Sequence, residues 1–154
     1  MHRAIGFAVL MSVMPGAGTL AASAEVRDAN LAPYVIADLG IARPLTDKPG
    51  NPTEGRKVAV GQQLGNCLAC HKLPIPEEDF HGEIGPDLHG VGGRLTAAML
   101  RLRIVDPKRV NPATSMPAFY KVDGLHRVIK NKQGQPMLTA QQVEDLVAYL
   151  LTLR

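Results

Sequence analysis

The sequence contains no tryptophan and few other aromatic residues. Three phenylalanines and three tyrosines bring the aromatic content of the 154 residues to only 4%. Aromatic side chains supply large buried areas, and a core with few of them gains less free energy to offset the entropy lost on folding. We therefore expect something other than side chains to fill part of the core.

The sequence also lacks a strong charge of either sign. Its formal net charge is only +3 at pH 7, and no run of lysine and arginine forms a basic stripe. Proteins that bind nucleic acid through phosphate contacts carry such stripes, so we expect no nucleic-acid partner. The charged content of 20% and the hydrophobic content of 45% are typical of a globular protein.

No apolar run is long enough to span a membrane, which takes about 20 residues. An apolar run at residues 4–13 instead follows a positively charged start and precedes a small-x-small sequence at residues 22–24. This order predicts a Sec-type signal peptide at residues 1–24, cleaved after Ala24, and no membrane insertion; the alternative is an uncleaved anchor. Cleavage leaves about 130 residues, enough for one compact domain.

Residues 25–50 predict an N-terminal extended arm rather than a helix or a free linker. Three prolines, Pro33, Pro44 and Pro49, interrupt the stretch, and no periodic pattern is sustained. Its apolar residues are too many for a disordered segment. We therefore expect the arm to pack on the domain or on a partner, and we favour a surface that faces a partner.

Residues 51–154 predict a helical domain with three clear helices. The first, at residues 51–64, opens on an asparagine cap followed by proline and closes at a glycine. The second, at residues 96–105, stops before an Asp-Pro pair. The third opens on a capping box at residues 139–142 and continues with apolar residues at i, i+3, i+4 and i+7.

The rest of the domain carries loop signals. Residues 72–93 are rich in proline and glycine, and residues 118–135 are undecided between loop and a short helical turn at residues 125–129. No stretch alternates apolar and polar residues over a useful length, so a sheet is not expected. The sequence therefore predicts an all-α domain of three to five helices without internal repeats.

The only two cysteines, Cys67 and Cys70, are separated by two residues and followed directly by His71. Two thiols at this spacing can lie beside the two vinyl groups of a porphyrin, and the next residue is then directed at the metal. The arrangement predicts one covalently bound haem c, held by both sulfurs, with His71 as an iron ligand. Such a haem would also supply the core volume that aromatic residues do not.

Three other interpretations of the Cys-x-x-Cys pair are weaker. A thioredoxin-like dithiol expects a strand-helix-strand context, whereas the residues before Cys67 indicate the end of a helix. A structural zinc site needs four ligands, and this motif offers three at most. A lone disulfide across two residues would be strained and would close almost no loop.

An iron bound by His71 on one side needs a second protein ligand or an open position. Met116 is the preferred second ligand, because it lies in a Met-Pro loop 45 residues after His71 and before the last helix. Met137 is better explained as an apolar staple for that helix. The remaining candidates are Met99 as a core residue, His81 and His89 as structural loop residues, and His126 as a solvated residue.

Together these features resemble the class I c-type cytochromes over residues 51–153. The matching motifs are Cys-Leu-Ala-Cys-His at residues 67–71, Gly-Pro-Asp-Leu-His-Gly at 85–90, Met-Pro-Ala-Phe at 116–119 and Val-Ala-Tyr-Leu at 147–150. The resemblance implies a cytochrome c-like fold around one haem, with the first and last helices crossing near Ala59 and Tyr149.

The same resemblance implies two further residues of the haem site. The carbonyl of Pro86 would accept a hydrogen bond from the ring of His71 and fix its tautomer. Arg94 would pair with a haem propionate, the alternative being a solvated loop arginine.

A narrower resemblance is to the SoxX family, the monohaem subunits of SoxAX thiosulfate-oxidising complexes. The matching stretches are residues 44–52, 65–71, 105–112 and 116–120. The resemblance implies a periplasmic electron-transfer subunit of an L-cysteine S-thiosulfotransferase, which conjugates thiosulfate to a carrier-protein cysteine. The implied partners are a SoxA-like catalytic haem subunit in a heterodimer, a SoxYZ-like carrier protein and a downstream acceptor cytochrome.

The sequence leaves two other functions open. A freely diffusing electron carrier would not need the arm at residues 25–50. A haem-based ligand sensor would need a vacant or displaceable second axial position. In each case the isolated chain would transfer electrons or bind a ligand and would not itself catalyse the conjugation.

Overall fold

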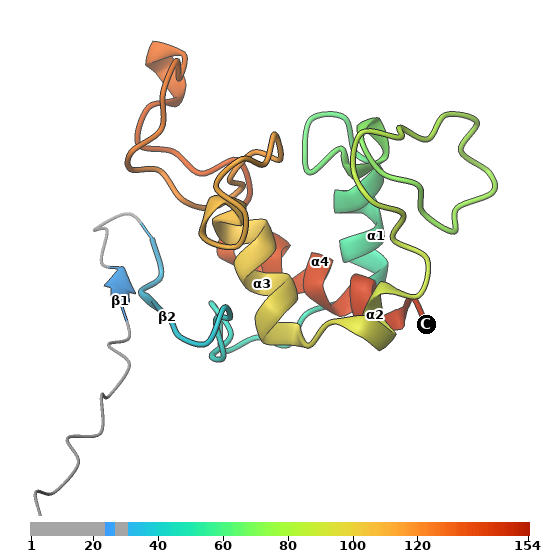
Figure 1. Ribbon diagram of the computed structural model, residues 1–154, viewed down its shortest axis with the longest axis horizontal. Coiled ribbons are helices and arrows are strands. Elements are labelled where there is room, and N and C mark those ends of the chain that lie inside the picture. The colour runs from blue at the N-terminus through green and yellow to red at the C-terminus, as the bar shows by residue number, and fades with distance from the viewer. Residues whose placement is uncertain (1–23, 27–30) are drawn as a thin grey trace, which may run out of the picture.

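The computed structural model describes residues 24–26 and 31–154 of the chain. The signal peptide predicted at residues 1–24 lies outside this part, except for Ala24. The described residues form a mainly helical domain, which confirms the predicted all-α class (Figure 1). Its α-helices are α1 Pro52–Val60, α2 Val91–Arg94, α3 Ala97–Val105 and α4 Ala140–Thr152, and its 3-10 helices are Cys67–Ala69, Pro107–Arg109 and Lys130–Lys132.

Helix α1 begins as the sequence predicts and ends earlier. The side chain of Asn51 accepts a hydrogen bond from the backbone N–H of Thr53 at 2.9 Å, which satisfies one of the free donors of the first turn. The helix stops before Gly61, which takes an extended backbone conformation. The N–H of Gly65, the expected end of the helix, instead donates to the carbonyl of Val58 at 3.0 Å.

Helix α4 has the cap and the buried face that the sequence predicts. The hydroxyl of Thr139 accepts a hydrogen bond from the N–H of Gln142 at 3.2 Å, and the Gln142 side chain accepts one from the N–H of Thr139 at 2.8 Å. This reciprocal pair is a capping box. The apolar positions along the helix are all buried: Val143, Leu146, Val147 and Leu150.

Helices α1 and α4 pack against each other at Gly55. A Cβ atom at Gly55 would lie 1.9 Å from the carbonyl oxygen of Asp145 and 2.8 Å from the Cβ atom of Tyr149. Only glycine therefore allows the two backbones to approach this closely. Ala59, which the resemblance placed at the crossing, is fully buried.

Helix α2, Val91–Arg94, forms at the end of the stretch 72–93, for which the sequence predicted only loop. Its central glycines disfavour a helix, so local propensity gives no signal for it. The stretch is instead held by the end of the chain, because the N–H of Gly92 donates to the carbonyl of Leu153 at 2.8 Å. A Cβ atom at Gly92 would lie 2.5 Å from the carbonyl oxygen of Leu151, so the glycine permits this contact.

The arm folds back on the domain. Strands β1 Ala24–Val26 and β2 Tyr34–Ile36 pair in an antiparallel ribbon with Glu25 opposite Val35. The ribbon was not predicted, since strands of three residues are too short to show an alternating pattern. Four apolar side chains of the arm join the core: Leu31, Tyr34, Ile41 and Leu45.

A buried ion pair fastens the arm to the helices. Arg101 on α3 and Glu144 on α4 make two contacts, Nε to Oε1 at 2.7 Å and Nη2 to Oε2 at 2.8 Å. The arm adds the carbonyl of Ile41, 2.6 Å from Arg101 Nη1, and the N–H of Leu45, 2.9 Å from Glu144 Oε1. Both charged side chains thus have hydrogen-bond partners in the interior, which offsets their desolvation.

Residues 121–137 leave the body of the domain between α3 and α4 (Figure 1). The helical turn left undecided at residues 125–129 lies instead at Lys130–Lys132. In the part of the chain that the structure describes, no helix has the length and apolar character that crossing a membrane requires.

Candidate functional site

The Cys-x-x-Cys-His motif lies on a compact turn after α1. Cys67 opens a 3-10 helix, preceded by Asn66 in the left-handed region at φ 44. The carbonyl of Cys67 accepts hydrogen bonds from the N–H of Cys70 at 3.1 Å and from the N–H of His71 at 2.9 Å. Neither cysteine is joined in a disulfide among the described residues. The backbone therefore brings both thiols and the imidazole into one rigid turn.

The ring of His71 is oriented by the backbone of the Gly-Pro segment. Its Nδ1 atom lies 2.7 Å from the carbonyl oxygen of Pro86. A carbonyl can only accept, so the proton of a neutral imidazole sits on Nδ1 and the lone pair of Nε2 stays free. This is the tautomer that a metal-binding histidine needs.

Two glycines allow the loop to pack this tightly on the motif. A Cβ atom at Gly85 would lie 2.2 Å from Cε1 of His71, and a Cβ atom at Gly82 would lie 2.1 Å from the carbonyl oxygen of Ala69. The N–H of Gly85 donates to the carbonyl of Cys70 at 2.7 Å. The family resemblance pointed to the Gly-Pro pair, and sequence reasoning missed Gly82, because nothing local distinguishes it from other loop glycines.

His81 and His89 both have partners within their own loop. Nδ1 of His81 accepts a hydrogen bond from the backbone N–H of Leu73 at 3.2 Å. Nε2 of the same ring lies 3.2 Å from the carbonyl oxygen of Ile75. His89 has Nδ1 2.5 Å from a carboxylate oxygen of Asp87. These contacts are those of residues that hold a loop together.

Arg94 lies on the same loop and holds its backbone. Its guanidinium donates to the carbonyl oxygens of His89 at 2.5 Å and of Asp87 at 3.1 Å. Asp87 directly follows Pro86, so the two bonds fix the segment that carries the acceptor for His71. The backbone N–H of His89, and then its ring, lower the pKa of the Asp87 carboxyl.

Burial determines the state of the first thiol. Desolvation raises the pKa of Cys67 from its ordinary value of 9.0 to about 12, so the thiol is uncharged at neutral pH. An uncharged, buried sulfur is suited to a contact with an apolar group. Cys67 also packs at the edge of the hydrophobic core.

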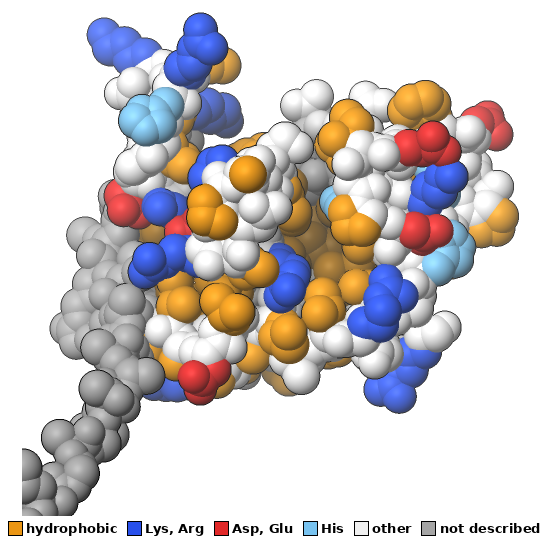
Figure 2. Space-filling view, in the orientation of Figure 1, with side chains coloured by type: hydrophobic (Ala, Val, Ile, Leu, Met, Phe, Trp, Pro, Cys, Tyr) orange, Lys and Arg blue, Asp and Glu red, His pale blue; other side chains and the backbone are white. Residues whose placement is uncertain are grey.

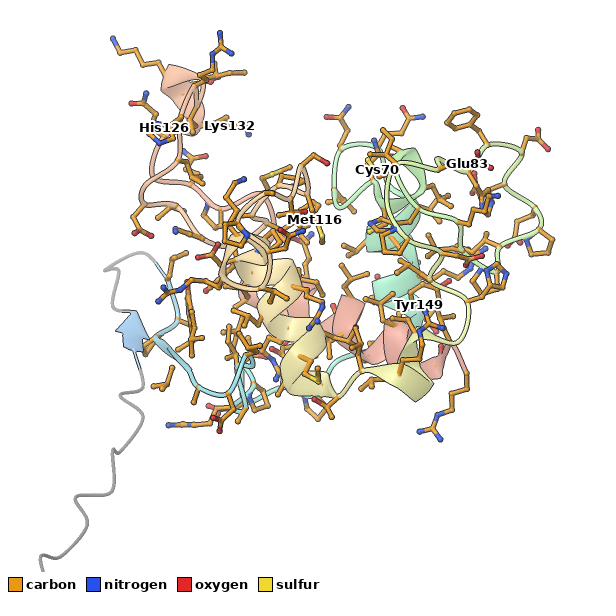
Figure 3. The ribbon with its side chains drawn as sticks, viewed as in Figure 1. Cys70, Glu83, Met116, His126, Lys132 and Tyr149 are labelled. Carbon is orange, nitrogen blue, oxygen red and sulfur yellow. The ribbon has the colours of Figure 1, made fainter. Side chains whose placement is uncertain are left out.

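Met116 lies across a hollow from the Cys-x-x-Cys-His turn. Figure 3 labels Met116 and Cys70 on opposite sides, and Figure 2 shows hydrophobic atoms covering the floor of the hollow between them. Met116 is half-buried against the core, and its N–H donates to the hydroxyl of Thr114 at 3.2 Å. The hollow combines an apolar floor, two thiols, a correctly protonated imidazole and a thioether, and these groups fit a haem.

The other candidate ligands lie elsewhere. Figure 3 shows His126 at the far end of residues 121–137, away from Cys70. Met137 is 54% exposed, so it does not pack as the predicted apolar staple of α4. Leu138, which directly precedes the Thr139 cap, is buried instead. Among the described residues, no cluster of three or more His, Cys, Asp and Glu residues is placed to hold a metal ion.

The geometry agrees with what the comparisons with known proteins find. The family model for cytochrome c matches residues 53–154. A chain in the crystal structure of SoxXA from P. pantotrophus is 43% identical, with a TM-score of 0.73. The match covers 78% of this chain and 93% of that one. The comparison with curated proteins gives no match.

The family match covers the whole helical domain, including the haem motif, the loop with Pro86 and Arg94, and the loop with Met116. A sequence identity of 43% to the SoxXA chain indicates a shared family as well as a shared fold. This chain therefore belongs to the cytochrome c family, as a class I c-type electron-transfer cytochrome with covalently bound haem c that is similar to SoxX.

Proposed function

We propose that this chain is the monohaem electron-transfer subunit of a periplasmic L-cysteine S-thiosulfotransferase, in a heterodimer with a SoxA-like catalytic haem subunit. The observation that carries the proposal is the 43% identity to a chain of SoxXA, over 93% of that chain. A small-residue sequence at residues 22–24, after an apolar run, supports export to the periplasm.

The residues that hold the haem are assigned in this proposal. Cys67 and Cys70 would hold it through thioether bonds, and His71 and Met116 would be the ligands of its iron. Haem c, when bound, supplies an iron that takes up and releases one electron at a time. Met116 would tune this chemistry, because a thioether ligand raises the reduction potential.

The chain's other residues orient these ligands. The carbonyl of Pro86, 2.7 Å away, keeps the proton of His71 on Nδ1, so that the lone pair of Nε2 would be free to bind the iron. Arg94 fixes the backbone that follows Pro86. Its pairing with a haem propionate is part of the proposal and rests on the family resemblance alone. The buried faces of α1 and α4 keep water from the apolar side of the site.

The reaction of the complex releases two electrons, which this chain carries away. A carrier-protein thiol and thiosulfate form one sulfur-sulfur bond: R–SH and S₂O₃²⁻ give the conjugate R–S–S–SO₃⁻, one proton and two electrons. The SoxYZ-like carrier provides the thiol, and the SoxA-like subunit provides the site where the bond forms. This chain passes the electrons singly to a downstream acceptor cytochrome. If His71 and Met116 both bind the iron, no ligand position would remain for the substrate, and the chain alone would transfer electrons without catalysing the conjugation.

Gentle purification of the chain from its native host tests the assignment. We expect a larger haem protein to co-elute in a fixed ratio at low salt, and thiosulfate with the carrier protein to reduce the haem of the complex. The isolated chain should give no reduction under the same conditions. Elution as a monomer, with no thiosulfate-dependent reduction in any fraction, would contradict the proposal.

A freely diffusing electron carrier is the second candidate, and one observation favours it. The arm was expected to face a partner, but Leu31, Tyr34, Ile41 and Leu45 bury on the chain's own helices. The arm therefore needs no partner to cover those side chains. Under this alternative the chain elutes alone and exchanges electrons rapidly with unrelated redox proteins.

A further inference from the structure

Residues 121–137 form a projecting segment, here called the basic excursion. The segment leaves the domain after Tyr120 and returns at Leu138, and both of these residues are buried. Between them most residues are exposed, and the segment stands clear of the helices (Figure 1). None of the residues that hold the proposed haem belongs to it, so its shape needs a separate explanation.

The backbone of the excursion has defined turns and a 3-10 helix. Gly124 at φ 62, Arg127 at φ 60 and Gly134 at φ 71 make its turns. The N–H of Lys132 donates to the carbonyl of Ile129 at 2.8 Å, within the 3-10 turn. The side-chain amide of Gln133 donates to the carbonyl of Val128 at 3.3 Å, which links the two sides of this turn. The side chains at the tip are therefore presented on a defined backbone.

The charge of the excursion is almost entirely positive. Arg127, Lys130 and Lys132 are exposed, and Asp123 is its one acidic residue. Figure 3 shows Lys132 beside His126 at the tip, and Figure 2 shows the basic side chains gathered there. Acidic side chains gather instead on the other side of the hollow, over the loop that carries Glu83 (Figures 2 and 3).

Apolar side chains are exposed among these cations. Ile129 is 72% exposed, and Leu125 and Met137 are exposed to 40% and 54%. An apolar anchor surrounded by charged residues is the composition of a protein interface, in which the anchor supplies affinity and the charges supply orientation and speed of association.

We propose that the basic excursion is a docking element for an acidic surface of a redox partner protein. Ile129 is the apolar anchor, and Arg127, Lys130 and Lys132 surround it and attract the partner. The inference does not depend on thiosulfate chemistry, because it needs only a partner that exchanges electrons with this cytochrome. It can therefore hold or fail independently of the proposed SoxXA-type activity.

A protein surface fits the excursion better than two other occupants. An anionic membrane is attracted by clusters of about four to eight lysines and arginines, more than the exposed set here. A second copy would have to offer its own acidic loop, in which two of the four carboxylates at residues 77–83, those of Glu77 and Glu83, already pair with Arg56 and with Lys72. The carboxylates of an acidic patch on a different protein need not already pair with basic residues of their own chain, so they can pair with the excursion.

Rapid-mixing kinetics with a defined probe tests the charge of the excursion. The reduced holoprotein is mixed with an oxidised small acidic copper protein, so that one electron passes from the haem iron to Cu(II). We expect the Lys130→Glu, Lys132→Glu variant to react at least about tenfold more slowly at low ionic strength, since electrostatic steering is worth about 10- to 1,000-fold. The rate of the unaltered protein should fall with added salt, and that of the variant should not.

A matched control carries the same change of charge elsewhere. Arg43 and Lys48 are exposed on the arm, outside the proposed contact. At about 0.1 M ionic strength, where the Debye length is about 10 Å, the Arg43→Glu, Lys48→Glu variant should change the rate by less than about threefold and the Lys130→Glu, Lys132→Glu variant by more. Equal effects of the two variants would show that only net charge matters and would overturn the proposal.

A second matched pair tests the anchor. Ile129→Ser removes the proposed anchor, and Ile84→Ser removes an isoleucine of similar exposure, 75%, on the acidic loop. We expect the first variant to weaken binding of the acidic probe and the second to leave it unchanged. An effect of Ile84→Ser as large as that of Ile129→Ser would overturn the assignment of the anchor.

Two further measurements distinguish the other occupants. Sedimentation of the unaltered protein should show a monomer at low salt, and it should not pellet with phosphatidylglycerol vesicles. A dimer that the Lys130→Glu, Lys132→Glu change dissociates would assign the excursion to a second copy. Vesicle binding lost in the same variant would assign it to a membrane, and either result would overturn the proposal.

Discussion

The Nδ1 atom of His71 lies 2.7 Å from the carbonyl oxygen of Pro86, and Gly85 is the residue that permits this approach. The ring occupies the space that a side chain at position 85 would fill. The hydrogen bond therefore depends on a residue that makes no polar contact with the ring. Its loss would free the imidazole to change tautomer and orientation.

Gly85→Ala should disturb the ring of His71 more than any other small change in this loop. A Cβ atom there would lie 2.2 Å from Cε1, so the loop or the ring must move. We expect a loss of about 1–3 kcal/mol in the free energy of unfolding of the holoprotein, the usual cost of overpacking. The midpoint potential should rise, because loss of the Pro86 hydrogen bond makes the ligand less basic. Denaturant titration and potentiometry measure the two effects.

Gly93→Ala is the matched control for that substitution. A Cβ atom at Gly93 meets nothing within 4 Å, and the residue lies in the short helix α2. We expect unchanged potential and unchanged or slightly higher stability, since alanine favours a helix. A potential that shifts equally in both variants would contradict the role given to Gly85.

Met116→Ala should remove the second axial ligand in the proposed site. The variant should lose the absorption of a methionine-ligated haem, bind carbon monoxide in the reduced state and have a lower midpoint potential, because the thioether favours reduced iron. Absorption spectroscopy and carbon monoxide titration measure these changes.

Met137→Ala is the control for the ligand assignment. Its side chain is 54% exposed, and it lies two residues before the Thr139 cap of α4. The spectrum of this variant should match that of the unaltered protein. An unchanged spectrum in Met116→Ala, or an altered one in Met137→Ala, would transfer the second ligand to another residue.

The parts of the fold that the sequence predicted are those that depend on neighbours in the chain. The caps at Asn51 and Thr139 act within three residues, so their patterns are visible in a single sequence. The Cys-x-x-Cys-His motif is equally local. The contact between His71 and Pro86 spans 15 residues, and only the resemblance to a known family suggested it.

The parts that the sequence did not predict depend on distant backbone. Gly55 and Gly92 look like unfavourable residues in a helix until α4 and the end of the chain approach them. The ion pair between Arg101 and Glu144 joins residues 43 apart and is completed by the arm. Ordinary sequence patterns place both side chains on the surface, because charged residues are rarely buried.

Glu144→Gln should be one of the most destabilising single changes in the chain. It leaves the buried guanidinium of Arg101 without its counter-charge, and breaking a buried pair in this way costs about 3–5 kcal/mol. The double variant Arg101→Met, Glu144→Leu should lose less, because no uncompensated charge remains. Urea denaturation of the holoproteins measures both.

Glu54→Gln is the surface control for the buried pair. Glu54 and Lys57 pair at 2.8 Å with both side chains largely exposed, and such pairs contribute little to stability. We expect no measurable change. A loss of stability in Glu144→Gln no larger than in this control would mean that the arm is not held by the ion pair.

Alkaline pH should destabilise the arm through Tyr34. Burial, followed by the negative charges of Asp106 and Asp123, raises the pKa of Tyr34 from 10.0 to about 12. In the unfolded chain the phenol ionises at its ordinary pKa, so its contribution to stability is complete below pH 10 and is lost as the pH rises towards 12. We expect a loss of about 1–2 kcal/mol in this window, less than the full shift implies because solvent screens the charge of the exposed Asp123. Tyr34→Phe cannot ionise, so denaturant titrations from pH 9 to 12 should show a shallower decline in the variant; equal declines would place the alkaline sensitivity in another residue.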